Sequence, residues 1–149
     1  MVQILRTDSN HPDFVALVKA LDHYLRVQDG EEHAFYAQFN KIENLKYVLI
    51  AYHQNEAVGC GAIKPFDIQS MEVKRMYVKP AYRGQKIASQ LLTALENRTR
   101  ELAMSRCILE TGKRQPEAIA LYEYSGYQRI PNYGQYQGMD NSVCFEKQL

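Results

Sequence analysis

Residues 73–92, VKRMYVKPAYRGQKIASQLL, decide the fold of this 149-residue chain. The stretch begins as an extended segment, turns at Pro80 and passes through a basic loop containing Gly84 into an amphipathic helix. Backbone N–H groups in the first turn of a helix have no partner within the helix, and the helix dipole favours negative charge beside them. The stretch therefore predicts a phosphate-binding site where the loop meets the helix.

A second segment further along the chain has the same strand-then-helix character. It reads LETG at residues 109–112, then AIALYEYSGY at residues 118–127. Together the two segments resemble motifs A and B of the GNAT N-acetyltransferases, and their order and separation match as well. In motif A, an Arg/Gln-x-x-Gly-x-Gly/Ala loop, here RGQKIA at residues 83–88, wraps the pyrophosphate of acetyl-CoA. The family most often has Gly where this chain has Lys86, and we expect the Lys to keep the helical backbone and add a positive charge.

The resemblance extends over nearly the whole chain and implies its fold. Residues 58–64 resemble the family's third strand and residues 142–147 its last strand. The fold class implied is α/β, a GNAT-type mixed, splayed β-sheet of six to seven strands flanked by about four helices. The splay lies between the fourth and fifth strands, where exposed backbone hydrogen-bonds the pantetheine arm of the cofactor.

Hydrophobic periodicity and turn residues predict the individual elements. We expect a helix after Pro12, a second helix over residues 31–40, a long helix over residues 85–102, and a helix over residues 116–124 that ends at Gly126. The expected strands cover residues 2–6, 47–52, 57–64, 72–78, 106–110, 127–130 and 143–147, with the second and third forming a hairpin.

Composition bounds the class of protein. Residues 1–149 are enough for one domain with a sizeable core, which we take as a single acyltransferase domain. A net charge of +1 gives no general attraction to nucleic acid or anionic membranes, and no apolar run reaches the length of a membrane span. The three cysteines are expected to be reduced and buried in a cytoplasmic protein, and the four scattered histidines predict no metal site. The N-terminus lacks the pattern of a secretion signal.

The resemblance also implies which residues contact acetyl-CoA. The backbone of the fourth strand would polarise the acyl carbonyl through a β-bulge, and the loop and first helical turn would bind phosphates. Gln115 stands where many family members have a cofactor-contacting Asn. The predicted cofactor-binding residues are Met76, Tyr77, Val78, Arg83, Gly84, Gln85, Lys86, Ile87, Ala88, Gln115 and Tyr122.

Two residues are predicted to carry the proton transfers. Tyr122 occupies the position of the motif B tyrosine, which implies that it protonates the leaving thiolate, although any one of eleven tyrosines is more often a packing residue. Glu72 is the expected general base, and Glu110 is the second candidate; an acid at a strand end is often only a solvated surface group. The loop of residues 133–136 would line the acceptor pocket or form a surface turn.

The function implied is transfer of acetyl from acetyl-CoA to a primary amine by direct attack in a ternary complex. The acceptor, a small-molecule or peptide amine, is not ranked by the sequence. The alternative is a non-catalytic acyl-CoA-binding sensor, which would need neither Tyr122 nor Glu72. A nucleotide-binding protein is disfavoured, because the chain lacks a Gly-x-x-x-x-Gly-Lys-Ser/Thr loop. Family members are often homodimers, and an exposed last strand is expected to be available for pairing.

Overall fold

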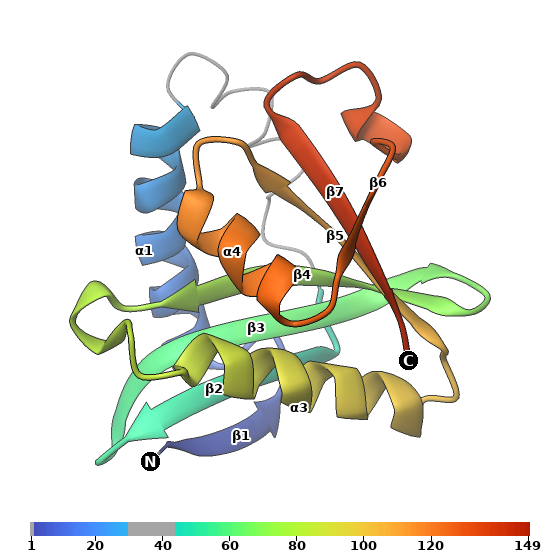
Figure 1. Cartoon of the computed structure of the whole chain (residues 1–149). Coiled ribbons are helices and arrows are strands. Elements are labelled where there is room, and N and C mark those ends of the chain that lie inside the picture. The colour runs from blue at the N-terminus through green and yellow to red at the C-terminus, as the bar shows by residue number, and fades with distance from the viewer. Residues whose placement is uncertain (1, 30–43) are drawn as a thin grey trace.

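A computed structural model describes residues 2–29 and 44–149 of the chain. The first half of the described residues is mainly strands, and the second half alternates strands with helices (Figure 1). The α-helices are α1 (Pro12–Asp29), α3 (Ile87–Glu101) and α4 (Pro116–Tyr124), with short 3-10 turns η2 (Pro80–Tyr82) and η3 (Gly134–Tyr136). The strands are β1 (Gln3–Thr7), β2 (Tyr47–His53), β3 (Glu56–Asp67), β4 (Ser70–Val78), β5 (Arg106–Gly112), β6 (Gln128–Ile130) and β7 (Ser142–Gln148).

All seven strands form one mixed sheet in the order β1-β2-β3-β4-β5-β7-β6. Every neighbouring pair is antiparallel except β4 and β5, which run parallel. That parallel ladder is short, because β4 pairs with β5 only from Ser70 to Glu72. Beyond Glu72 the two strands diverge, although β4 continues to Val78 and β5 to Gly112. The predicted α/β fold and the splay between the fourth and fifth strands are confirmed.

Helices cover both faces of the sheet. On one face, α1 packs Phe14, Leu17 and Val18 against alternate residues of β2 and β3. On the other face lie α3 and α4, which stand in front of the sheet in Figure 1. The strands that pass between the helices therefore bury both of their sides, which explains their nearly continuous apolar sequence.

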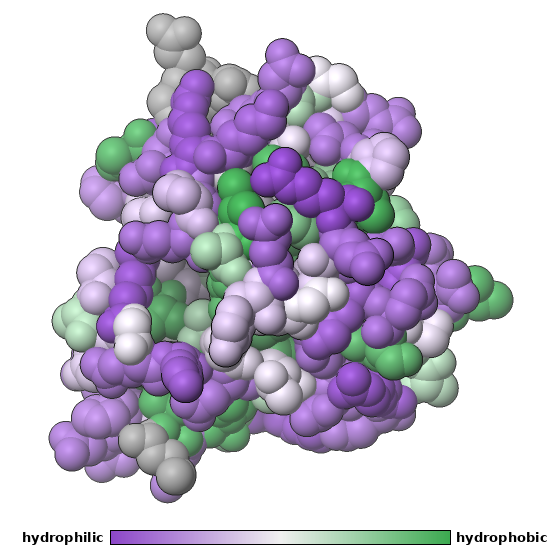
Figure 2. All heavy atoms as spheres, viewed as in Figure 1, coloured by the Kyte–Doolittle hydropathy of each residue, from purple (hydrophilic) through white to green (hydrophobic). Residues whose placement is uncertain are grey.

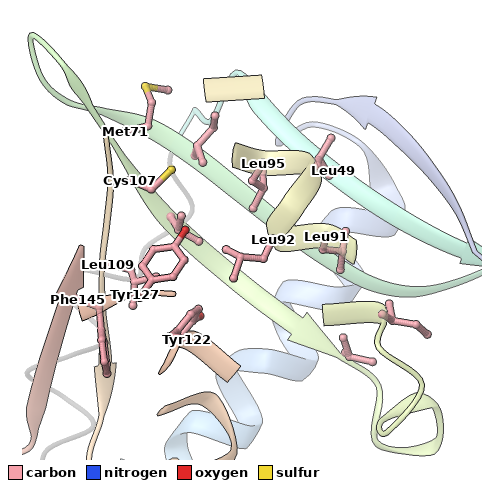
Figure 3. Close-up of a cluster of buried hydrophobic side chains, with 14 of the residues drawn as sticks. Leu49, Met71, Leu91, Leu92, Leu95, Cys107, Leu109, Tyr122, Tyr127 and Phe145 are labelled. Atoms are coloured by element: carbon pink, nitrogen blue, oxygen red, sulfur yellow. The ribbon is translucent and has the colours of Figure 1, made fainter. Parts of the chain in front are cut away.

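The larger core joins the two halves of the splayed sheet. Leu91, Leu92 and Leu95 of α3 are almost fully buried at the spacing expected for one helical face. They pack with Tyr122 of α4 and with Phe145 of β7 in a single apolar cluster (Figure 3). The two sides of the splay are thus connected mainly by side-chain packing, since few backbone hydrogen bonds cross between β4 and β5.

A β-bulge interrupts β4 beside the splay. Cys60 pairs with Tyr77 and Ala62 with Lys74, so that two residues of β4, Arg75 and Met76, oppose the single residue Gly61. Arg75 has a left-handed backbone, with φ of 60°. A Cβ atom on Gly61 would lie 2.6 Å from the Met76 sulfur, so a larger residue there would force the Met76 side chain to move. The bulge implied by the family resemblance is confirmed.

Several predicted boundaries were wrong. The hairpin of β3 and β4 extends beyond the predicted residues 64 and 72, because Pro65 lies on an exposed stretch of β3 where its missing N–H is tolerated. The long helix begins at Ile87 instead of residue 85. The last strand, β7, is not exposed at an edge, because β6 pairs along its outer side. The helix predicted over residues 31–40 lies outside the described residues, which contain the other three predicted α-helices.

The three cysteines are buried and unpaired, as predicted. Within residues 2–29 and 44–149, no helix combines the length and the apolar character that crossing a membrane requires.

Candidate active site

A cavity of about 640 Å³ runs from the N-terminus of α3 to the splay between β4 and β5. We call it the large cavity. It is lined by the end of β4, the turn after it, the first turn of α3, and residues of α1 and α4. Figure 2 shows hydrophobic atoms at the bottom of a recess in this face, with hydrophilic residues around its rim. A space with an apolar interior and a cationic, amide-rich mouth suits an extended ligand that ends in phosphates.

The N-terminus of α3 presents free amides to this cavity. The first hydrogen bond of the helix is donated by the Gln90 N–H to the Lys86 carbonyl, so the N–H groups of Ile87, Ala88 and Ser89 have no acceptor within the helix. No side chain caps this terminus, and no acidic residue lies in the first turn. The arrangement leaves the positive end of the helix dipole to an anionic ligand.

Two residues before the helix have left-handed backbones. Gly84 has φ of 79°, and a Cβ atom there would meet nothing within 4 Å. Lys86 has φ of 64° and ψ of 19°, so the expectation that Lys86 keeps a helical backbone was wrong. Lys86 instead adopts the conformation for which glycine is best suited, at a cost of about 1–2 kcal/mol for a residue with a Cβ atom. The turn into α3 fixes that backbone angle, while the side chain stays exposed beside the cavity.

Arg83 contacts two elements, β4 and α1, at the mouth of the large cavity. Its Nε donates a hydrogen bond of 2.9 Å to the Val78 carbonyl at the end of β4. Its guanidinium lies 5.1 Å from the ring centroid of Tyr24 in α1 and 5.7 Å from that of Tyr77. These contacts fix the position of a cation beside the helix terminus, which a solvated surface arginine would not achieve.

A second, smaller cavity of about 110 Å³ lies within the splay itself. We call it the small cavity. It is lined by β4, β5, α1, α4 and Tyr136 of η3, and it shares Met76, Gln115 and Tyr122 with the large cavity. Glu72 and Glu110 both line it. The two cavities therefore meet at Tyr122, with carboxylates on one side and the helix terminus on the other.

Tyr122 is buried at this junction. It is 6% exposed, and its ring packs against Tyr127 and Phe145 with centroid separations of 5.8 and 6.0 Å. Burial, followed by the nearby charge of Glu110, raises the pKa of the Tyr122 phenol above its ordinary value of 10. The phenol is therefore neutral at physiological pH and available as a proton donor.

The carboxyl group of Glu72 is fixed by a hydrogen bond from Tyr133, which lies 61 positions later in the sequence. Glu72 is 6% exposed, and its Oε2 accepts a hydrogen bond of 2.6 Å from the Tyr133 hydroxyl. Tyr133 in turn packs edge-on against Phe66 and against Tyr136. A buried carboxylate with one charge-assisted hydrogen bond is fixed in orientation. Glu72 is therefore a buried side chain and not the solvated surface acid that its place at a strand end also suggested.

Most of the residues predicted to bind the cofactor line the large cavity. Gln85 is the exception, since it is exposed and does not line the cavity. Gln115 lies at the N-terminus of α4 and contributes to both cavities. The predicted residues that the large cavity brings together are Met76, Tyr77, Val78, Arg83, Gly84, Lys86, Ile87, Ala88, Gln115 and Tyr122.

Sequence reasoning missed Arg75, which lines the small cavity although it is 8% exposed. The available signal was the pair Lys74-Arg75 within an otherwise apolar strand. It also missed the roles of Tyr24 and Tyr133, for which the spacing along the chain gives no signal.

The buried tyrosines near the site make stability sensitive to alkaline pH. Burial is the main cause of a raised pKa for Tyr122, Tyr127, Tyr133 and Tyr136. In the unfolded chain these phenols lose their protons near pH 10, while the folded chain keeps them. Burial also raises the pKa of the Cys60, Cys107 and Cys144 thiols, which lose their protons at about pH 8.5 in the unfolded chain. The free energy of unfolding is therefore expected to begin falling above about pH 8.5, and each tyrosine steepens the fall above pH 10 by up to ~1.4 kcal/mol per pH unit. Urea unfolding followed by circular dichroism between pH 8 and 11 measures this slope.

Two variants provide the controls for this experiment. Tyr133→Phe removes one of the four phenols and is expected to reduce the slope by about one group's share, ~1.4 kcal/mol per pH unit. Tyr124, the last residue of α4, is 88% exposed, and Tyr124→Phe is expected to leave the slope unchanged. Equal slopes in both variants and in the unmodified protein would contradict this account.

Comparison with known proteins identifies relatives over the full length of the chain. Residues 14–127 match the model of the acetyltransferase (GNAT) family. An IAA acetyltransferase from Azospirillum brasilense is 34% identical over 157 aligned positions, which cover 99% of this chain and 98% of that protein.

Solved structures have the same architecture. A structure from Klebsiella pneumoniae, assigned as an acyl-CoA N-acyltransferase, has a TM-score of 0.84 and 34% identity, covering 100% of this chain and 98% of the other. A PaiA N-acetyltransferase from Thermoplasma acidophilum, solved with coenzyme A, has a TM-score of 0.73 at 17% identity, covering 100% and 99% of the two chains. At that identity the second likeness shows the fold alone.

Proposed function

The chain belongs to the acetyltransferase (GNAT) family and is an acyl-CoA-dependent N-acetyltransferase, and from this premise we propose which of its residues bind acetyl-CoA and transfer the acetyl group. The observation that carries the proposal is the meeting of the two cavities at Tyr122. The donor enters through the large cavity, the amine through the small cavity, and the reacting atoms meet between them.

The pyrophosphate of acetyl-CoA binds at the N-terminus of α3. The backbone N–H groups of Ile87, Ala88 and Ser89 support this placement, because they have no acceptor within the helix. The positive φ of Gly84 and Lys86 also supports it, because these residues direct the preceding backbone around the N-terminus of α3. Arg83 and Lys86 add positive charge. The pantetheine arm follows β4 beyond Glu72, where the strand has lost its pairing with β5 and retains backbone donors and acceptors for a ligand.

The acetyl carbonyl lies at the bulge of β4. A bulge leaves one residue outside the ladder, so an N–H of Arg75, Met76 or Tyr77 is available to the oxyanion that forms during acyl transfer. Met76 lines both cavities, which places this part of the backbone beside Tyr122. The residues of the bulge therefore act through their backbone, while the Met76 side chain fills space against Gly61.

Transfer occurs by direct attack in a ternary complex. The amine nitrogen attacks the thioester carbon, the carbon–sulfur bond breaks, and the sulfur receives the phenolic proton of Tyr122. Glu72 accepts the proton that the amine loses, directly or through water, and the phenol is reprotonated from solvent. The neutral, buried state of Tyr122 and the fixed orientation of Glu72 support these roles.

Calorimetric titration with acetyl-CoA, with ATP as the control ligand, tests the donor site. We expect selective binding of acetyl-CoA in the micromolar range, because the large cavity offers both a phosphate site and an apolar channel. Folded protein that binds neither ligand, or that prefers ATP, would contradict the proposed donor site. Free thiol released in the presence of a panel of amines then measures turnover.

Two further expectations concern the cellular compartment and the oligomeric state of the enzyme. We propose that the enzyme acts in the cytoplasm, where its three unpaired, buried cysteines would remain reduced. We also propose that it forms a homodimer, as the family resemblance implies, and light scattering coupled to gel filtration tests this state.

A further inference from the structure

Arg75 is a buried cation whose hydrogen-bonding capacity is only partly used. Its side chain is 4% exposed, and its Nη1 donates to Asp22 Oδ1 of α1 at 2.9 Å. Its Nη2 is buried and has no hydrogen-bond partner within the part of the chain that the structure describes. An arginine stays charged at every physiological pH, so an unpaired N–H in this position is costly unless a ligand satisfies it.

Arg75 also lines the small cavity, and its guanidinium is directed toward Asp22 of α1. The Asp22 bond fixes the guanidinium at one nitrogen and leaves the other for a further acceptor. A planar guanidinium held in this way matches the geometry of a carboxylate. The bulge gives Arg75 its left-handed backbone. It therefore positions the Arg75 side chain, in addition to exposing an amide for the acyl oxygen.

The small cavity contains charges of both signs. Glu72 and Glu110 supply carboxylates, while Lys74 and Arg75 supply cations. A site for a polyamine or another polycation would be lined by carboxylates alone, and a simple monoamine would leave the Arg75 Nη2 unpaired. The mixture suits a ligand that carries one positive and one negative group on a short spacer, and a volume of about 110 Å³ restricts it to a small one.

We propose that the acceptor is a small amino-carboxylate, such as a free amino acid, whose carboxylate binds Arg75 while its amine faces Glu72. This inference rests on the proposed function, since it assigns the acceptor of the same site. Arg75 is then a specificity-determining residue, and Asp22 positions it.

The first test uses the unmodified protein and needs no variant. Each of the twenty common amino acids is offered as the free acid and as its carboxamide, with thiol release from acetyl-CoA as the readout. At least one free acid is expected to exceed its amide at least about tenfold in kcat/KM, because the amide oxygen can accept the hydrogen bond of Arg75 but carries no negative charge to pair with the guanidinium. Amides that react as well as the acids, or turnover only with amines lacking a carboxylate, would overturn the inference.

The second test assigns the discrimination to Arg75. Arg75→Gln is expected to reduce the ratio of acid to amide kcat/KM to about one. The matched variant Lys74→Gln removes the other positive charge of the same cavity, and it is expected to lower the ratio much less than Arg75→Gln does, because only Arg75 is proposed to bind the carboxylate directly. A ratio that falls with Lys74→Gln and survives Arg75→Gln would overturn the assignment. If Arg75→Gln does not fold, Asp22→Asn keeps the arginine but frees its guanidinium, and a smaller fall in the ratio is expected.

Failure of this inference is distinguishable from failure of the proposed function. Acetyl-CoA binding with no preference for the free acids removes only the amino-carboxylate acceptor. Folded protein that does not bind acetyl-CoA removes the donor site and the inference with it. A purely structural Arg75 would lower the stability of Arg75→Gln while acid and amide rates changed together.

Discussion

Replacing Tyr122 with phenylalanine is expected to lower kcat by about 10²- to 10³-fold while the Kd for acetyl-CoA changes less than about twofold. The substitution removes one oxygen and keeps the ring that packs against Tyr127 and Phe145. The core is therefore preserved, and the loss falls on the proton that the departing sulfur requires. Steady-state thiol release gives kcat, and calorimetry gives the affinity.

The matched control for this experiment is Tyr124→Phe. Tyr124 lies two residues away on the same helix and is 88% exposed, so its hydroxyl has no part in either cavity. It is expected to retain full activity. A Tyr122→Phe enzyme with an unchanged kcat would remove Tyr122 from the mechanism. A loss of acetyl-CoA affinity as large as the loss in kcat would make Tyr122 a binding residue instead.

Replacing Gly84 with aspartate is expected to weaken acetyl-CoA binding at least about 30-fold, or ~2 kcal/mol. A Cβ atom at Gly84 has room, because nothing lies within 4 Å. The expected loss therefore comes mainly from a carboxylate beside the pyrophosphate and the positive end of α3. The backbone strain of φ at 79° adds a smaller part, since Asp tolerates the left-handed region better than most residues.

Two variants separate charge from strain in this experiment. Gly84→Asn has the shape of the aspartate without its charge and is expected to bind acetyl-CoA within about threefold of the unmodified protein. Gly138→Asp places the same residue at φ of 78° with no atom within 4 Å, but in a loop outside the large cavity. It is expected to leave the affinity unchanged. Should Gly84→Asp bind as tightly as Gly84→Asn, the phosphates do not lie at this helix terminus.

The elements near the motifs were the most predictable from sequence, because local chemistry determines them. The chain turns at Pro80 after β4, and the buried leucines define the face of α3 that packs on the sheet. Gly126, with φ of 92°, follows the end of α4 as predicted. One error concerned a backbone angle that residue type does not determine. Lys86 takes a glycine-like backbone because the turn before α3 requires it, and a residue type alone does not reveal that angle.

The charged groups of the small cavity were less predictable. Tyr133 and Glu72 are separated by 61 positions in sequence and meet only after the whole sheet has formed. Arg75 reaches the cavity because the β4 bulge changes the direction of its side chain relative to a regular strand, and strand alternation alone would misplace it. A one-residue irregularity in the ladder thus decides which side chains meet the acceptor.

The short pairing of β4 with β5 also has a consequence for the lifetime of the protein. Only three residues of each strand join β4 to β5, so few ladder hydrogen bonds hold the two halves of the sheet together at the seam where the cofactor is proposed to lie. A ligand that occupies this seam takes the place of missing ladder bonds, and at 100 times its Kd it adds about 2.7 kcal/mol to the free energy of unfolding. On the proposed binding mode, the cell's supply of acetyl-CoA would set how much of the enzyme survives proteolysis as well as how fast it works.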